Sequence, residues 1–221
     1  MRELIAELER VERRVGGGGD GHVVELTRAY DATVEDLWDA CTRPERVVRW
    51  FLPLSGDLRP GGSYQLEGNA GGRIEACEPP RHLRLTWVFG EQQSLVEVDL
   101  AALADDRARL RLRHTVPDDD HWRQFGPGAV GVGWELGLLG LAAHLAGEQI
   151  DPATLATSPE LAEVMQRGAE LWGRAHAGSG VPAEVARAAA ERTRAAYAGE
   201  PGPDATVEPT ANGEGPGPAA G

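Results

Sequence analysis

Apolar and polar residues alternate through much of the first half of this chain, which is the pattern of strands with one buried face. Alternation is present over residues 23–29. It returns after residue 62 in short segments that are separated by Gly, Pro, Asn and Asp residues. These segments are residues 63–67, 73–77, 81–89, 95–100 and 108–116. The pattern therefore predicts an antiparallel meander that follows one earlier strand.

The parity of the alternation separates two faces of the predicted sheet. Charged residues such as Arg84, Glu97 and Arg111 occupy one parity and are expected to meet water. The other parity is expected to face the core and comprises Tyr64, Leu66, Ile74, Ala76, Leu83, Leu85, Trp87, Phe89, Val96, Val98, Leu100, Leu110, Leu112 and His114. A sheet with one apolar face needs a second layer to cover it.

Two short helices are predicted between the first strand and the meander. Thr33, with Asp36 three residues later, has the spacing of a capping box. Thr42 followed by Pro44 predicts a second helix start, with an apolar stripe that ends in Trp50 and Phe51.

The long apolar segment 128–146 is the best candidate for the covering layer. It is apolar on nearly all sides, which is typical of a buried helix. A membrane span is the alternative, but Glu135, His144 and several glycines interrupt the segment, and its length is at the lower limit for a bilayer. The charged N-terminus lacks the apolar stretch of a secretory signal, so we expect a cytoplasmic protein.

The two ends of the chain have different patterns. Residues 1–15 carry the apolar stripe of an amphipathic helix, and residues 16–21 are predicted to form a Gly-rich linker. A phosphate-binding loop is disfavoured there because the preceding strand, the Lys and the Ser or Thr are missing. Residues 148–198 predict a helical extension with starts near Pro152, Pro159 and Pro182. Residues 199–221 predict a disordered tail.

Composition excludes several classes of partner. The net charge of −13 argues against nucleic acid and against anionic membranes. The chain contains no Lys, which indicates a GC-rich bacterial coding bias. Cys41 and Cys77 are expected to be buried free thiols rather than a disulfide, given a cytosolic setting. The histidines have no metal-ligand spacing, and we predict no metal and no cofactor.

Five segments together resemble a known family. They read RAYDATVEDLWDACTRPERVVRWF, GDLRPGGSY, GGRIEACEPPRHLRLTWVF, LRLRHTV and GPGAVGVGWELGLLGLAAHLA, and they span about residues 23–147. In this order they resemble the helix-grip, START-like (SRPBCC) superfamily, in the branch of the C-terminal domain of the activator of the Hsp90 ATPase.

The resemblance implies an α+β fold in which a curved antiparallel sheet wraps around a long C-terminal helix, with two short helices at one end and a cavity between sheet and helix. We expect this domain to occupy residues 22–147. The superfamily includes lipid carriers, hormone receptors, polyketide aromatases and cyclases, and co-chaperones, so the fold does not decide the function.

We expect an apolar or amphipathic small molecule in that cavity. Candidate lining residues are Trp38, Trp50, Phe51, Tyr64, Leu85, Trp87, Phe89, Val98, Leu112, His114, Trp134 and Leu138. Helical spacing favours a core role for Trp38, Trp50 and Phe51, whereas Trp87, Phe89 and Trp134 fit a core role and a wall role equally.

His114 and Glu135 are the possible polar groups of the pocket. A hydrogen-bonded structural histidine is the simpler interpretation of the first, and pairing with an Arg is the simpler interpretation of the second. No nucleophile with a partner base is found in the sequence, and we predict no catalytic residue. An Hsp90-activator-like interaction protein and a cyclase or dehydratase that uses His114 and Glu135 are the alternatives. The sequence leaves the oligomeric state open.

Overall fold

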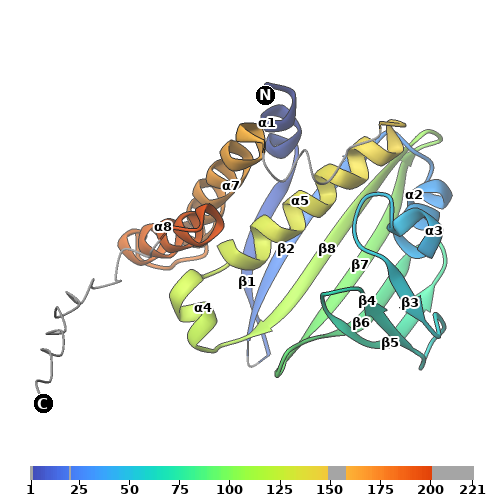
Figure 1. Ribbon diagram of the computed structural model, residues 1–221, viewed down its shortest axis with the longest axis horizontal. Helices are drawn as coiled ribbons and strands as arrows, with labels where there is room; N and C mark the ends of the chain where they lie inside the picture. Colours follow the sequence, from blue (N-terminus) through green and yellow to red (C-terminus); the bar gives the residue numbers. More distant parts are fainter. Residues whose placement is uncertain (1, 20, 149–157, 201–221) are drawn as a thin grey trace, which may run out of the picture.

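A single antiparallel sheet of eight strands curves around one long helix in the computed structural model, which describes residues 2–19, 21–148 and 158–200 (Figure 1). The strand order is β1-β2-β8-β7-β6-β5-β4-β3. The strands are β1 (Glu12–Gly18), β2 (Gly21–Tyr30), β3 (Leu54–Gly56), β4 (Ser63–Leu66), β5 (Gly71–Glu78), β6 (His82–Phe89), β7 (Gln92–Ala104) and β8 (Arg107–Pro117). The helices are α1 (Arg2–Glu9), α2 (Val34–Thr42), α3 (Pro44–Val47), α4 (Asp120–Phe125), α5 (Gly128–Leu145), α7 (Pro159–Gly178) and α8 (Ala183–Ala198). The predicted α+β helix-grip fold is confirmed.

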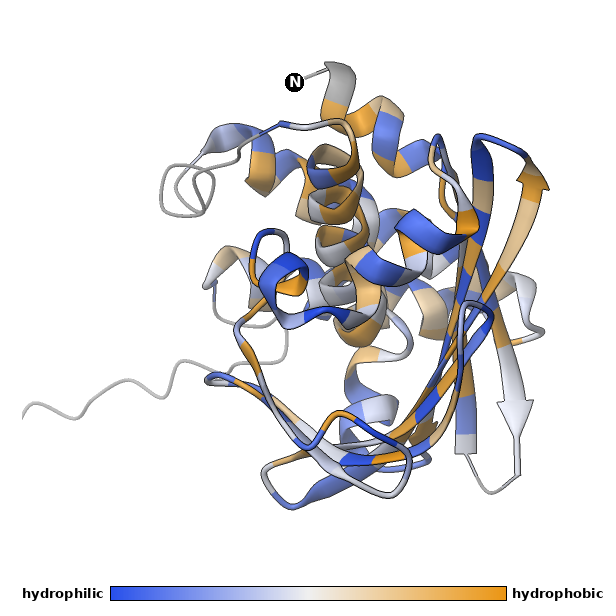
Figure 2. Cartoon of the chain, turned by 90° about the vertical axis from the view of Figure 1, so that its right-hand side faces the viewer, coloured by the Kyte–Doolittle hydropathy of each residue, from blue (hydrophilic) through white to orange (hydrophobic). Residues whose placement is uncertain are grey.

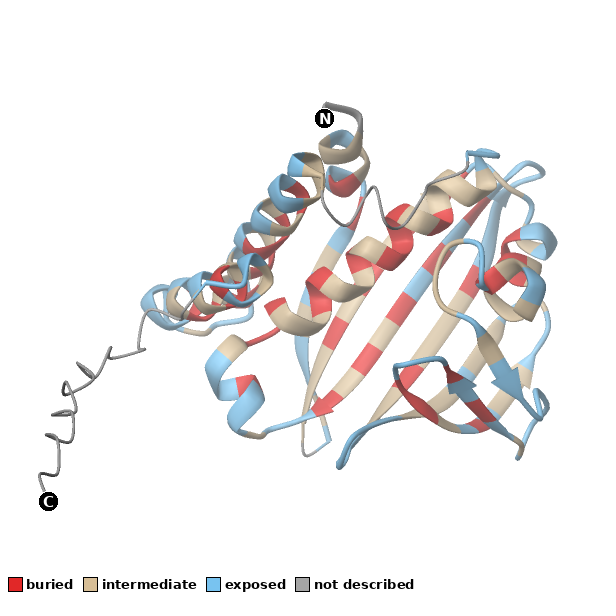
Figure 3. Ribbon diagram, viewed as in Figure 1, coloured by how far each residue is buried: buried red, intermediate tan, exposed pale blue. Residues whose placement is uncertain are grey.

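Period-two alternation sets the two faces of the sheet, as predicted. Buried and less buried positions alternate along β8 (Figure 3). Leu110, Leu112 and His114 are buried, and the arginines between them lie on the outer face. Those arginines pair with carboxylates of the adjacent strand, for example Arg113 with Glu97 at 3.0 Å. Apolar colour recurs along the strands and along the central helix that they surround (Figure 2).

Two of the residues predicted to face the core lie elsewhere. An irregularity between Ile74 and Ala76 shifts the pairing of β5 with β6, so that Cys77 lies opposite the inward Leu83. Ala76 consequently takes the outward parity, and its predicted inward position is wrong. Phe89, at the end of β6, is 57% exposed because the strand there extends past the helix layer that covers the rest of the sheet.

The first predicted helix start is confirmed and the second is displaced. Thr33 Oγ1 accepts a hydrogen bond from the Asp36 amide at 3.1 Å, which caps α2. Thr42 belongs instead to the end of α2, where its hydroxyl donates to the Trp38 carbonyl. The second helix, α3, is a single turn, so Trp50 and Phe51 lie in the turn that follows it.

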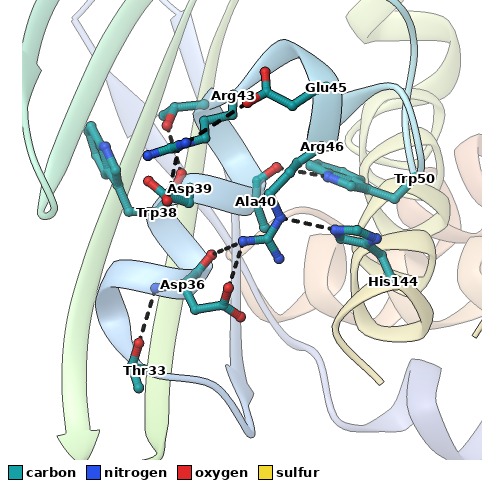
Figure 4. A network of polar contacts seen from close by, with 11 residues as sticks. Thr33, Asp36, Trp38, Asp39, Ala40, Arg43, Glu45, Arg46, Trp50 and His144 are labelled. Carbon is teal, nitrogen blue, oxygen red and sulfur yellow. Dashed lines mark hydrogen bonds and ion pairs between the residues drawn. The ribbon is translucent and has the colours of Figure 1, made fainter. Parts of the chain in front are cut away.

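Arg46 connects these short helices to the long one. Its guanidinium contacts the Asp36 carboxylate at 2.6 Å and donates to His144 Nε2 of α5 at 3.3 Å (Figure 4). The Trp50 indole N–H donates to the Ala40 carbonyl at 2.9 Å. The α2–α3 unit is therefore fixed over one end of the sheet.

The prediction for the N-terminal segment is wrong beyond residue 9. The helix predicted over residues 1–15 stops at Glu9. Strand β1 takes in the end of that predicted helix and the first three residues of the linker expected at 16–21, and in it Val15 pairs with Val24 and Gly16 with Val23. Without this strand, β2 would expose a row of unpaired backbone amides and carbonyls. Pairing with β2 satisfies the backbone groups on one side of residues 12–18, and the glycines at positions 16–18 have a low helix propensity.

Helix α5 is the central helix of the domain and packs on the inner face of the sheet. Among the residues described, it is the one helix whose length and hydropathy would suit a membrane span, yet half of it is buried inside the protein. A core helix surrounded by protein explains the same composition.

The two extension helices predicted near Pro159 and Pro182 are present as α7 and α8. Helix α7 packs beside α5 and β1, and α8 packs against α7 and α4 (Figure 1). Trp172 of α7 is completely buried. Gly131 of α5 permits this contact, because a Cβ there would lie 2.6 Å from Cδ2 of Trp172 and closer still to two other indole atoms. The predicted helix near Pro152 and most of the predicted tail lie outside the described residues.

Candidate ligand cavity and its aromatic wall

A cavity of about 150 Å³ lies between the inner face of the sheet and α5, under the turn that follows α3. Residues of strands β3 to β8 form its sheet side. Gly137 lines the cavity from the helix side. The helix is not tightly packed at this position, because an added Cβ would meet Phe51 at the ordinary contact distance of 3.5 Å. The wall is almost entirely apolar.

The structure brings most of the predicted pocket residues together. Those that line the cavity are Trp50, Phe51, Tyr64, Leu85, Trp87, Val98, Leu112, Trp134 and Leu138. Trp38 is buried in the main core instead, which agrees with the core role favoured for it. Phe89, His114 and Glu135 do not line this cavity.

The alternation of the strands also indicates several other wall residues. Leu66, Ile74 and Leu83 already had the inward parity, although they were not selected as pocket residues. Cys77 could not be found in this way because a local irregularity in strand pairing brings it inward. Cys41 lines the cavity from α2, and both cysteines are free thiols.

Aromatic rings form a continuous band along one side of the cavity. The Trp50 ring stacks on Phe51 at a centroid distance of 5.4 Å, and Phe51 stacks on Trp134 at 6.0 Å. Trp134 in turn packs against Trp87 at 5.0 Å. Rings in such offset and tilted arrangements give a rigid apolar surface.

The polar atoms in the wall are engaged or neutral. The Tyr64 hydroxyl donates to the Thr86 carbonyl at 2.8 Å. Burial raises the pKa of the Cys41 thiol to about 12, and it also raises the pKa of Cys77. Both thiols are therefore weak nucleophiles at neutral pH, and the cavity is suited to apolar contact rather than to charge recognition.

His114 lies at the edge of the aromatic band with both ring nitrogens satisfied. The Trp134 indole N–H donates to Nδ1 at 3.0 Å, so Nδ1 must be the unprotonated nitrogen. Nε2 therefore carries the hydrogen and donates to Ser94 Oγ at 2.8 Å, while that hydroxyl donates to the Trp87 carbonyl at 3.1 Å. Burial lowers the pKa of His114 to about 4, which keeps the ring neutral. This geometry is that of a structural histidine.

Glu135 does not face the cavity, so its predicted place in the pocket is wrong. Its carboxylate forms an ion pair with Arg13 of β1 and packs against Gly168 of α7. Burial raises its pKa to about 7, and the adjacent Arg13 opposes that shift. Although Glu135 follows Trp134 directly in sequence, helical geometry turns successive side chains by about 100°. His114 and Glu135 therefore belong to different environments and do not form one catalytic pair.

No group of three or more His, Cys, Asp or Glu side chains suited to a metal ion occurs within residues 2–19, 21–148 and 158–200. The chemistry available at this site is that of apolar enclosure.

A curved antiparallel sheet that grips a long helix around an apolar cavity defines a protein of the helix-grip class. The sequence model described as "Activator of Hsp90 ATPase homolog 1-like protein" matches residues 31–146, just over half of the 221 residues. This chain belongs to that family.

Solved structures of similar proteins agree with this assignment. The crystal structure of CalU16 from Micromonospora echinospora is 35% identical, with a TM-score of 0.65 over 75% of this chain and 97% of CalU16. DynU16, described as a putative protein in the dynemicin biosynthetic locus, is 22% identical, with a TM-score of 0.52 over 57% of this chain and 48% of DynU16. An HSP90 activator from Plasmodium falciparum is 22% identical, with a TM-score of 0.50 over 57% of this chain and 96% of that protein. Both of these more distant likenesses concern the fold alone. A search of curated proteins found no match.

Proposed function

We propose that this protein binds an apolar or amphipathic small molecule in the cavity between the sheet and α5. The apolar, aromatic-lined wall of that cavity is the observation that carries the proposal. Ligand pockets are mostly apolar and concave, and rigid aromatic walls provide contact area at a low entropic cost. A cytoplasmic location remains part of this proposal.

Catalysis is disfavoured by the arrangement of the polar groups. The cyclase or dehydratase hypothesis required His114 and Glu135 to act together. The first is saturated by hydrogen bonds and the second is paired with Arg13 on another side of the helix. A general base must reach the proton that it removes. We therefore propose a binding protein rather than an enzyme.

An interaction with an Hsp90 chaperone is the second candidate, and the description of the matched family favours it. The Plasmodium falciparum activator supports it less, since 22% identity establishes only a shared fold. The cavity is a feature that chaperone binding does not require, so small-molecule binding ranks first.

Toluene is a suitable probe, because a dry cavity of about 150 Å³ holds one aromatic ring. We expect toluene to raise the Tm and to shift the Trp134 indole N–H signal in NMR spectra. A Val98→Phe substitution should fill the cavity and abolish both effects. Leu103→Phe is the matched control, because Leu103 is on the same strand and 48% exposed.

The outcome depends on this pair of variants. Circular dichroism of both proteins establishes that they are folded. Equal toluene responses in V98F and L103F would contradict the proposed location of the site, and the absence of any response in the natural protein would contradict the proposal itself.

A further inference from the structure

The cavity is smaller than most ligand sites. Its volume of about 150 Å³ compares with roughly 300–1,000 Å³ for typical small-molecule pockets. A ligand of more than one ring must therefore extend beyond it. The direction of that extension can be inferred from the neighbouring surface.

A groove of about 540 Å³ adjoins the cavity at the N-terminal end of α5. Trp87 lines both spaces, so the groove begins where the aromatic band of the cavity ends. The Trp87 ring is half-buried and contacts the rings of Trp134 at 5.0 Å and His114 at 5.9 Å. These three rings form the partition between the cavity and the groove.

The C-terminal extension contributes to the groove. Tyr197 of α8 lines it, and its hydroxyl donates to the Ala129 carbonyl at 2.8 Å, which fixes α8 against the first turn of α5. The residues matched by the family model end at position 146, so this wall comes from a part of the chain outside that match.

The rim of the groove is both apolar and polar. Phe89 is an exposed aromatic residue, with 57% of its surface accessible. Gln92 donates to an Asp119 carboxylate oxygen at 3.0 Å, and His121 also lines the groove. The carboxylate and the amide carbonyl are acceptors, so they favour a ligand group that donates hydrogen bonds and disfavour an anion.

We propose that one elongated ligand occupies both spaces, with an apolar ring in the cavity and a second, hydrogen-bond-donating part in the groove. The two parts connect beside Trp87, the residue that lines both spaces. This inference rests on the proposed function, since it assumes that the cavity holds the apolar end. Through Tyr197, helix α8 of the C-terminal extension then forms part of the ligand site.

Two probes separate the two spaces. Toluene fits the cavity alone, whereas N-phenyl-1-naphthylamine has two aromatic parts joined by an N–H donor and needs both. We expect Phe89→Ser to weaken binding of the longer probe about fivefold or more, since an aromatic contact contributes about 1 kcal/mol. Toluene binding should be unchanged. Val48→Ser is the matched control, because Val48 is 47% exposed and lies outside both spaces.

A second pair of variants tests the extension. Tyr197→Ala should weaken binding of N-phenyl-1-naphthylamine by a similar factor and leave toluene binding unchanged, whereas Tyr197→Phe keeps the ring and should retain most of the affinity. In NMR spectra of the natural protein, the longer probe should shift the indole N–H signal of Trp87 further than toluene does.

The results distinguish the two proposals. If V98F abolishes binding of both probes while F89S and Y197A leave the longer probe unaffected, the shared-ligand inference is overturned and the proposed function stands. If the natural protein binds neither probe, both are overturned. Selective weakening of the longer probe in F89S and Y197A supports the inference.

Discussion

Gly131→Ala should destabilise this protein, although alanine is the better helix former. In a helix interior, replacing Gly by Ala contributes about 1 kcal/mol of stability. The new Cβ would overlap the Trp172 indole, which is rigid and 0% exposed. Overpacking of this kind costs about 1–3 kcal/mol, and an overlap of more than 1 Å belongs at the upper end. We therefore expect a net loss of about 2 kcal/mol in the free energy of unfolding.

Gly137→Ala is the matched control on the same helix. Its Cβ would meet Phe51 at 3.5 Å, an ordinary contact at the cavity wall, so the gain in helix propensity should remain. The two variants should differ by about 3 kcal/mol, or roughly 6–12 °C in Tm for a chain of this size. Urea unfolding followed by circular dichroism measures the difference.

A double-mutant cycle identifies the cause. In a Trp172→Leu background, the penalty of Gly131→Ala should shrink, because the overlapping indole is gone. Equal stability of G131A and G137A in the natural background would refute the reasoning, since it would mean that Trp172 does not pack against Gly131.

Two further predictions concern buried ionisable groups. The folded-state pKa of Glu135 is about 7, above its ordinary value of 4.5, so the natural protein should lose stability relative to Glu135→Gln as the pH rises from 4.5 to 8, by roughly 3 kcal/mol at most. Parallel pH profiles from urea unfolding of the two proteins would contradict this. The pKa of His114 is lowered from 6.5 to about 4, so its contribution to stability is present above pH 6.5 and is lost as the pH falls towards 4. Nitrogen-15 NMR of the imidazole should show the Nε2–H tautomer without titration above pH 5, and a ring that titrates near 6.5 would exclude the hydrogen bonds to Trp134 and Ser94.

Local signals in the sequence were sufficient for the central elements. The cap at Thr33 depends on a contact between residues three apart, and the buried face of β8 depends on a repeat of two, as at Leu110 and Leu112. Both act over short distances along the chain, so they can be predicted without knowledge of the fold. The resemblance of five such segments to one family then gave the helix-grip topology, which the structure confirms.

Residues of the candidate site could be predicted only where the regular alternation of a strand places them on its inner face. Tyr64, Leu85 and Val98 face inward because their strands alternate regularly, and the structure places all three in the cavity wall. Phe89 has the same parity, but it lies beyond the covering layer and borders the groove instead. How far α5 extends over each strand is a property of packing between distant segments.

By itself, the sequence determined which residues alternate, where the first short helix is capped and which segment is apolar enough to be the central helix. Tertiary structure decided the rest, because it depends on partners far apart along the chain. The open edge of β2 made residues 12–18 a strand instead of a helix and linker. The orientation of α5 about its axis places Trp134 in the cavity wall and Glu135 against Arg13. Two residues that are adjacent in sequence, and that the sequence alone assigns to one pocket, therefore lie in different environments.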